Sequence, residues 1–157
     1  MSVWNFAFGS HLSKKQLRRV IGREPRQAVR AVLPDHKLTF WGLAQFPEKH
    51  DVLALGGTAV IIAEEGRRVY GAAYLISDQE LRVLDEYESE WEYQRVQVQV
   101  RLESGELMPA HAHNRIGVGK FAPPSPSCLQ LMLEGLKEHG YPTSVINEVR
   151  EAAEHPI

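Results

Sequence analysis

The stretch Phe6-Ala7-Phe8-Gly9-Ser10-His11-Leu12 decides how this chain begins to fold. Residues 3–8 are apolar and aromatic, as in a strand that is buried on both faces, and the glycine and serine that follow end it. A helix should come next, because Ser13 and Gln16 have the spacing of a capping box. Backbone amides in such a loop can hold an anion, and glycine lets the backbone come close to a ligand.

A second segment, Leu84-Asp85-Glu86-Tyr87-Glu88, places several carboxylates where a helix ends. That helix should start at Ser77, because Ser77 and Glu80 form another capping box. A carboxylate at a helix end can move a proton, while the glycine loop can hold an anion. Together the two segments suggest a site for a small zwitterionic substrate.

The region between these segments reads as strands and connections. Residues 36–40 alternate and predict a strand, whereas the Arg-rich residues 25–30 and residues 46–56 read as connections. Residues 58–63 and 68–76 are rich in β-formers, and the glycine in the short polar stretch between them predicts a β-hairpin.

The second half of the chain adds a hairpin and two helices. Residues 94–102 alternate apolar with polar, and Gly105 turns that strand toward a partner that reaches Asn114. Residues 121–126 contain three prolines and should be irregular. Ser127 is expected to cap the next helix, which Gly140 ends, and a last helix covers residues 144–153. The pattern predicts an α+β fold with a mostly antiparallel or mixed sheet, curled into a small barrel.

Composition excludes several classes of function. The 157 residues are expected to form a single domain, 1–157, and the 18 Lys and Arg against 20 Asp and Glu do not favour nucleic acid as a partner. No apolar run is long enough for a membrane helix, so a soluble, cytoplasmic protein is expected. The single cysteine, Cys128, excludes an internal disulfide and should pack in a helix. The oligomeric state stays open, a homodimer included.

The chain resembles the γ-glutamylcyclotransferase family, in which an aromatic strand ends in Tyr-Gly-Ser-Asn-Leu. Here that motif stands as Phe8-Gly9-Ser10-His11-Leu12. The likeness covers nearly the whole chain in the same order: Gly57-Thr58-Ala59, Val69-Tyr70-Gly71-Ala72-Ala73-Tyr74, the acidic segment 84–88, the Val-rich strand with its Gly105 turn, and Ala122-Pro123-Pro124-Ser125-Pro126.

The resemblance implies a small mixed β-barrel with peripheral helices and a reaction without a cofactor or metal. In that reaction the α-amino group of a small γ-glutamyl substrate attacks its own γ-carbonyl, which gives 5-oxoproline and releases an amine. Glu88 matches the family's single catalytic glutamate, which acts as general base and acid. The residues implied to contact substrate are Ala7, Phe8, Gly9, Ser10, His11 and His113.

Four positions depart from the family pattern: Phe8 replaces tyrosine, His11 replaces asparagine, Ser89 replaces a glycine, and His113 lies about where a substrate-contacting tyrosine is found. They leave the identity of the γ-glutamyl compound open among glutathione-derived dipeptides, γ-glutamylamines and other γ-glutamyl intermediates. They also support an alternative, in which the same fold binds a γ-glutamyl ligand or a protein without turnover.

A third hypothesis is a metal-dependent hydrolase. His111 and His113 are two apart on a predicted strand and so share a face, where two imidazoles could bind a metal with His11 or Glu88 as a third ligand. The family resemblance implies no metal, so this hypothesis ranks below the other two.

Overall fold

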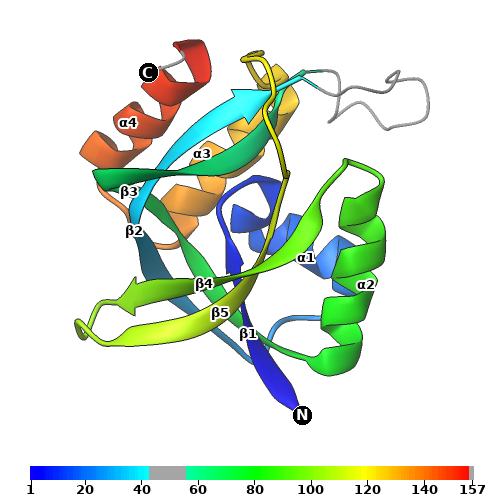
Figure 1. Cartoon of the computed structure of the whole chain (residues 1–157). Helices are drawn as coiled ribbons and strands as arrows, with labels where there is room; N and C mark the ends of the chain where they lie inside the picture. The colour runs from blue at the N-terminus through cyan, green and yellow to red at the C-terminus, as the bar shows by residue number, and fades with distance from the viewer. Residues whose placement is uncertain (43–55, 156–157) are drawn as a thin grey trace.

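A computed structural model describes residues 1–42 and 56–155 of the chain (Figure 1). The strands are β1 (Ser2–Ala7), β2 (Gln27–Trp41), β3 (Thr58–Ser77), β4 (Gln94–Leu102) and β5 (Leu107–Asn114). The helices are the short 3₁₀ turn η1 (Ser10–Leu12), α1 (Lys14–Ile21), α2 (Asp78–Ser89), α3 (Pro126–Glu138) and α4 (Thr143–Glu154). Most of the predicted connection 46–56 lies outside the described residues.

The five strands close into a barrel in the order β1-β3-β2-β4-β5. All neighbouring pairs are antiparallel except β1 and β5, which run parallel and meet at Asn5 and His111. This mixed, mostly antiparallel barrel with helices around it confirms the predicted fold class. Closure places the first strand of the chain against the last one, so residues far apart in sequence share one interior.

The hairpin predicted within residues 58–76 is wrong, because these residues form the single long strand β3. Residues 58–63 pair with residues 36–41 of β2, and residues 68–75 pair with residues 27–34 of the same strand. Between them, residues 64–67 lie opposite Asp35 alone. Gly66 adopts a φ of 84°, and its amide donates to Asp35 Oδ1 at 3.0 Å. The glycine therefore serves a bulge that bends both strands rather than a chain reversal.

Strand β2 is also longer than the sequence predicted. It begins at Gln27, within the Arg-rich stretch that read as a connection, and it runs on to Trp41. Arg30 shows why polar residues are tolerated there: its guanidinium pairs with Glu103 at the end of β4 and donates to the carbonyl of Gly140. The strand is thus fixed by partners that are distant in sequence.

The helix starts follow the capping patterns with two exceptions. Ser13 caps α1 and Ser77 caps α2, and Glu80 completes the capping box of α2 as predicted. The box predicted for α1 is not completed, because the Gln16 side chain bonds Tyr87 and Arg19 instead. Helix α3 is capped by Ser125 and not by Ser127, because Ser125 Oγ accepts from the amide of Cys128. Pro126 is the first helical residue, where its missing donor costs nothing.

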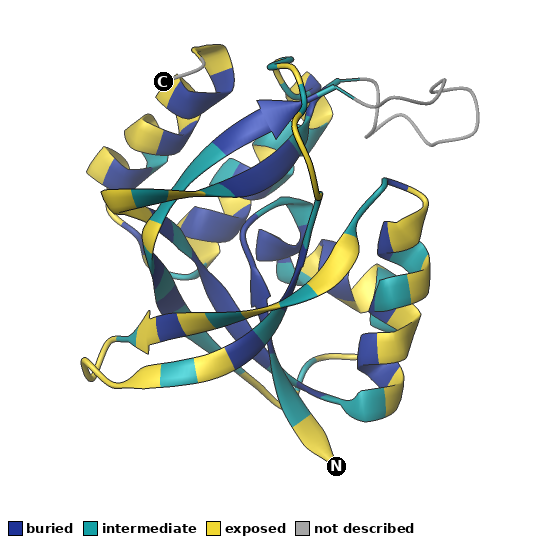
Figure 2. Ribbon diagram, in the orientation of Figure 1, coloured by how far each residue is buried: buried dark blue, intermediate teal, exposed yellow. Residues whose placement is uncertain are grey.

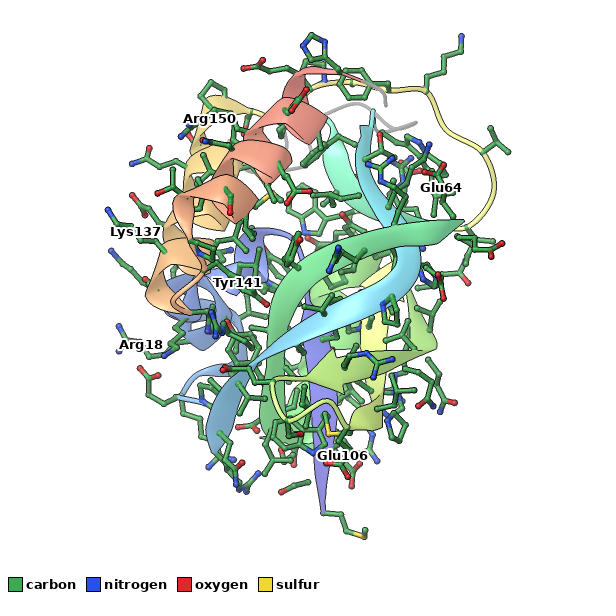
Figure 3. The ribbon with its side chains drawn as sticks, turned by 90° about the vertical axis from the view of Figure 1, so that its left-hand side faces the viewer. Arg18, Glu64, Glu106, Lys137, Tyr141 and Arg150 are labelled. Atoms are coloured by element: carbon green, nitrogen blue, oxygen red, sulfur yellow. The ribbon has the colours of Figure 1, made fainter. Side chains whose placement is uncertain are left out.

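The helices lie outside the barrel, and their apolar faces are buried where they pack against it (Figure 2). Tyr141, which precedes α4, lies between that helix and the sheet (Figure 3). Its hydroxyl donates to the carbonyls of Ala31 and Gly71, at 3.1 and 2.6 Å, and so ties the α3–α4 connection to β2 and β3. Within the described residues, none of the helices has the length and apolarity to span a bilayer.

Candidate active site

Glu88 lies in the last turn of α2, where the helix ends against the barrel. The carbonyl of Glu88 accepts from the amides of Trp91 and Tyr93, at 2.9 and 3.2 Å, so the chain after the helix folds back over this residue. Its side chain is 11% exposed, whereas Glu86 and Glu90 on either side of it are exposed. Among the acids of the predicted acidic segment 84–88, Glu88 is thus the one that is buried, whereas the Asp85 side chain is 33% exposed.

The turn η1 forms the opposite wall of the site. The hydroxyl of Tyr74, a fully buried residue of β3, lies 2.8 Å from the carbonyl oxygen of His11 and 3.1 Å from that of Leu12. His139 Nε2 lies 3.0 Å from the same Leu12 oxygen. Gly135 of α3 packs directly on this turn, because a Cβ there would lie 2.3 Å from the carbonyl carbon of Leu12. Strand β3 and the C-terminal part of helix α3 therefore fix the position of η1.

Gly9 plays a smaller conformational part than the sequence suggested. Its φ is −114°, outside the left-handed region, and an added Cβ would meet only the Cβ of Ala59 at 3.5 Å. The first amide bonded within η1 is that of Leu12, which donates to Gly9. The amides of Ser10 and His11 precede that bond, at the start of a 3₁₀ turn rather than of the longer helix α1.

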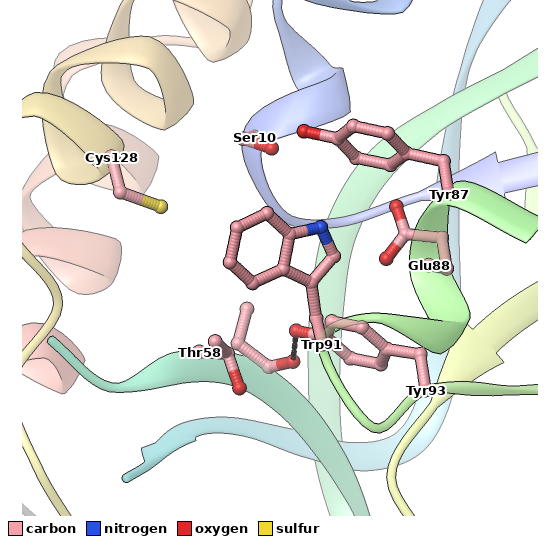
Figure 4. Close-up of a pocket in the computed structure, with 8 residues that line it drawn as sticks. Ser10, Thr58, Tyr87, Glu88, Trp91, Tyr93 and Cys128 are labelled. Carbon is pink, nitrogen blue, oxygen red and sulfur yellow. Dashed lines mark hydrogen bonds between the residues drawn. The ribbon is translucent and has the colours of Figure 1, made fainter. Parts of the chain in front are cut away.

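Two hollows meet at Ser10 and Glu88, which line both of them. The polar hollow is lined by Asn5, residues 6–11, Glu88 and His113, and encloses about 380 Å³ including space open to solvent. The aromatic hollow encloses about 420 Å³ by the same measure. Its other lining residues are Thr58, Ala59, Tyr87, Trp91, Tyr93 and Cys128 (Figure 4). Each hollow is of a size that suits part of a small-molecule ligand.

His11 and Glu88 form a buried pair between these hollows, with 3.2 Å between His11 Nδ1 and Glu88 Oε1. Burial raises the pKa of Glu88 to about 8, because the ionised carboxylate loses its hydration. Burial, together with the nearby His113, lowers the pKa of His11 to about 4. At neutral pH both shifts favour a protonated Glu88 beside a neutral imidazole.

His113 belongs to a second polar group on the floor of the site. Its Nε2 lies 2.7 Å from Asp85 Oδ1, and Asp85 also pairs with Arg95. Burial lowers the pKa of His113, although the Asp85 carboxylate opposes that shift. The pKa of Asp85 is lowered, since the hydrogen bonds from Arg95 and His113 outweigh its partial burial.

Some of the polar atoms in this interior have no partner among the described residues. They are Asn5 Oδ1, His11 Nε2 and His111 Nδ1. Asn5 and His11 both line the polar hollow, so a ligand or water there would meet two unsatisfied groups. This hollow is therefore suited to a polar ligand.

The structure brings together all the residues that the family resemblance placed at the site. Ala7, Phe8, Gly9, Ser10, His11, Glu88 and His113 line the polar hollow. Ser89, by contrast, is exposed and donates from its hydroxyl to the carbonyl of Glu86, outside both hollows. Its departure from the family pattern therefore concerns the helix end and not the pocket.

Sequence reasoning missed part of the aromatic hollow. Tyr93, Thr58 and Cys128 line this hollow but were not assigned to the site from the sequence. The resemblance at Gly57-Thr58-Ala59 was the signal that could have indicated Thr58. Cys128 lies on a helix, as predicted, but at a wall of the pocket where the helix meets the barrel (Figure 4).

The metal hypothesis finds no geometric support in residues 1–42 and 56–155. In this part of the chain, no three His, Cys, Asp or Glu side chains converge in a way that could hold a metal ion. His113 is instead bonded to Asp85.

The arrangement can hold a proton on Glu88 next to a polar hollow and an aromatic one. A buried carboxyl whose pKa lies near neutrality can accept and return a proton within a catalytic cycle. The adjacent backbone of η1 offers amide donors, and the polar hollow offers imidazole and amide side chains. Such a site suits proton transfer to and from a small polar ligand.

Comparison with protein families agrees with this geometry. A family model described as "Gamma-glutamyl cyclotransferase, AIG2-like" matches residues 5–115, which include η1, Glu88 and His113. None of the curated protein sequences matches the chain.

Solved structures give the same result. One named "Gamma-glutamyl cyclotransferase" has a TM-score of 0.80 and 25% identity, with 96% of this chain and 87% of that chain covered. An uncharacterized protein from Homo sapiens has a TM-score of 0.80 and 26% identity, with 95% and 86% covered. A γ-glutamyl cyclotransferase from yeast, titled as specific to glutathione, has a TM-score of 0.56 and 12% identity, with 99% and 89% covered. At that identity the yeast protein shares the fold alone.

Proposed function

Because this chain belongs to the γ-glutamyl cyclotransferase, AIG2-like family, we propose that it converts a γ-glutamyl compound into 5-oxoproline and a free amine. The observation that carries this proposal is the position of Glu88. Its buried carboxyl lines the same two hollows as Ser10 of the η1 turn. No other acid of residues 84–88 lines either hollow.

Glu88 acts as general base and then as general acid. Its carboxylate takes a proton from the α-ammonium group, and the resulting amine attacks the γ-carbonyl carbon. The new C–N bond gives a tetrahedral oxyanion, which collapses as the bond to the leaving amine breaks. The leaving nitrogen takes the proton from Glu88, which restores the carboxylate. The attacking nitrogen then loses its second proton through this carboxylate to the released amine, so the products are the neutral lactam and an ammonium ion. A pKa raised by burial suits both steps, since the group both accepts and releases a proton near neutral pH.

The polar hollow holds the γ-glutamyl part of the substrate. Its ammonium and carboxylate groups match the polar atoms of Asn5, His11 and His113 and the backbone of η1. Attack within one molecule gains mainly from orientation, which can lower a barrier by up to about 7–11 kcal/mol. A hollow that keeps the chain folded therefore supplies much of the catalysis, and only protons and the acyl group move, without a cofactor.

An assay of 5-oxoproline release tests this function. Purified protein is incubated with a panel of γ-glutamyl-amino acids, γ-glutamylamines and glutathione, and 5-oxoproline is measured. We expect product from at least one member, and a loss of about 10²-fold or more in Glu88→Gln. Glu86→Gln is the matched control, because Glu86 lies exposed on the same helix and should keep the parent rate.

Two outcomes would contradict the proposal. Equal rates in the parent and in Glu88→Gln would remove this carboxyl from the mechanism. Absence of 5-oxoproline from every substrate, combined with binding of γ-glutamyl compounds in calorimetry, would favour the alternative of a binding module without turnover.

A further inference from the structure

The aromatic hollow lies beside Glu88 and differs in chemistry from the polar hollow. Its walls, apart from Ser10 and Glu88, are Thr58, Ala59, Tyr87, Trp91, Tyr93 and Cys128. Figure 4 shows the ring of Trp91 in the middle of this wall, with the thiol of Cys128 across from it. These side chains come from β3, from the end of α2 and the segment after it, and from α3.

The hydroxyl groups of Thr58 and Tyr93 in this wall form hydrogen bonds with other protein atoms. The hydroxyl of Tyr93 donates to the carbonyl of Ala59, the bond drawn in Figure 4. The hydroxyl of Thr58 lies 3.2 Å from Arg115 Nη1. The surface left for a ligand is therefore mainly aromatic and aliphatic.

Arg115 is the cation in contact with Thr58, and it is already engaged. Its guanidinium donates to the carbonyl of Trp41 at 3.0 Å, lies 3.3 Å from Glu92 Oε1 and stacks over the ring of Trp41. Its side chain is 8% exposed. Among the described residues that line the aromatic hollow, none carries a positive charge.

We propose that the aromatic hollow binds the leaving group and that the preferred substrates are γ-glutamyl amides of apolar, uncharged primary amines. This inference rests on the proposed function. If the charged γ-glutamyl part fills the polar hollow, its γ-carbonyl lies at the junction formed by Ser10 and Glu88. The amine on the other side of the scissile bond then enters the aromatic hollow.

The same geometry disfavours leaving groups that carry a carboxylate. An amino acid or dipeptide would bring its carboxylate against the rings of Tyr87 and Trp91 and close to Glu88. A charge moved from water into such surroundings without a partner is strongly penalised. An aromatic amine, by contrast, can stack on these rings and bury its apolar surface.

Matched substrates separate these cases. We expect kcat/KM for γ-glutamyl-phenethylamide to exceed that for γ-glutamyl-phenylalanine, which adds only a carboxylate, by at least about tenfold. It should also exceed that for γ-glutamyl-ethylamide, which lacks the ring, by at least about tenfold. Binding to Glu88→Gln, measured by calorimetry, should follow the same order without turnover.

A substitution in the hollow provides a second readout. Cys128→Phe fills the wall across from Trp91 and should lower the phenethylamide to ethylamide ratio of kcat/KM by about tenfold. Ser127→Phe is the matched control, because Ser127 is exposed beside it on α3 and outside the hollow. That variant should keep the parent ratio.

The failure of this inference can be distinguished from failure of the proposed function. If 5-oxoproline forms but γ-glutamyl-phenylalanine or glutathione is preferred, or if Cys128→Phe leaves the ratio unchanged, the assignment of the aromatic hollow is overturned while the function stands. If no substrate turns over, the proposed function fails. Calorimetry on Glu88→Gln then still tests the inference about the aromatic hollow. Equal affinities for γ-glutamyl-phenethylamide and γ-glutamyl-phenylalanine would overturn it.

Discussion

The His11–Glu88 pair is the residue-scale feature on which the chemistry depends. The two side chains are 3.2 Å apart and almost fully buried, and burial moves their pKa values in opposite directions. For Glu88 the neutral acid is favoured until about pH 8, whereas His11 stays a neutral imidazole down to about pH 4. His11, which replaces the family's asparagine, thus lies beside the proposed base Glu88. At neutral pH it does not take the proton from the Glu88 carboxyl.

The first residue-scale prediction concerns the pH dependence of turnover. The base form of Glu88 is the carboxylate, so kcat/KM should rise with pH and level off above a midpoint near 8. Below the midpoint kcat/KM should fall about tenfold per pH unit. Measuring kcat/KM from pH 6 to 9.5 tests this, because kcat/KM reports the groups of the free enzyme, to which this pKa belongs. A profile that is flat over this range would contradict the prediction.

The second residue-scale prediction concerns stability. Between its unfolded pKa of 4.5 and about 8, native Glu88 holds a proton that the unfolded chain has lost, so the free energy of unfolding falls as pH rises. His11 acts oppositely between about pH 4 and 6.5, and His113 and His139, whose pKa values are also lowered, act in the same direction as His11. The unfolded chain still loses part of these histidine protons just above pH 6.5. The fall due to Glu88 from pH 6.5 to 8 is therefore the difference between the parent and Glu88→Gln.

Denaturant unfolding at several pH values measures this effect. The parent should lose about 2 kcal/mol at most between pH 6.5 and 8, since one pKa unit corresponds to about 1.4 kcal/mol. Glu88→Gln cannot ionise and should show no such loss, whereas the control Glu86→Gln should behave as the parent. Equal pH profiles for the parent and for Glu88→Gln would indicate that Glu88 is hydrated in the native state.

At the scale of elements, the site depends on how the η1 turn is held. The turn is too short to keep its place by its own hydrogen bonds, so β3 and α3 position it. Tyr74 and His139 bond its carbonyl oxygens, and Gly135 allows α3 to pack against its backbone. The α2 helix brings Glu88 from the other side and contacts α1 through Gln16 and Tyr87.

Two tyrosines test this role of the turn. Tyr74→Phe removes the hydroxyl that lies near the carbonyls of His11 and Leu12, and should cost about 1–3 kcal/mol of stability. The loss of this anchor should also lower kcat/KM by about tenfold, because small displacements of a positioned group are costly in rate. Thermal unfolding and steady-state kinetics measure both effects.

Tyr141→Phe is the matched control for that prediction. Its hydroxyl also bonds two buried carbonyls, those of Ala31 and Gly71, but neither residue lines either hollow. It should show a comparable loss of stability with normal kcat/KM at a temperature where the protein is folded. If Tyr141→Phe lowered kcat/KM as much as Tyr74→Phe, the effect would reflect general loosening rather than the position of η1.

At the scale of the whole molecule, closure of the barrel creates the site. The strand β1 lies between β3 and β5, and its parallel contact with β5 brings Asn5 next to His111. This contact places residues 5–11 beside His113 around the polar hollow, and α2 adds Glu88 to the same lining. Pairing between the first strand of the barrel, β1, and the last, β5, thus brings the residues of the candidate site together.

Hydrogen exchange should reveal this closure. Although β1 starts at the second residue, its inner amides around Phe6 should exchange only through global unfolding, because strands pair with it on both sides. The amides of residues 103–106, in the β4–β5 turn, should exchange much faster. Native-state exchange followed by NMR at increasing denaturant measures both. Rapid exchange at Phe6 would mean that β1 frays and that the barrel is open in solution.

The sequence predicted those features that depend on near neighbours. The N-caps at Ser13 and Ser77, the capping box at Ser77 and the alternation in β4 were predicted correctly, because a helix start or a strand face is set within a few residues. The hairpin at Gly66 was wrong for the same reason. A left-handed glycine serves a turn or a bulge equally well, and the choice depended on pairing with Asp35 of another strand.

The sequence by itself determined the order of the helices, the β4–β5 hairpin, the family motif and the place of Glu88 at a helix end. Only the tertiary structure decided that Glu88 is the buried acid, that His11 lies against it and that an aromatic hollow with Cys128 adjoins the site. The physical reason is that a pKa shift and a pocket both require the exclusion of water by several elements at once. No local pattern contains that information, because the exclusion arises from strands and helices that meet only when the barrel closes.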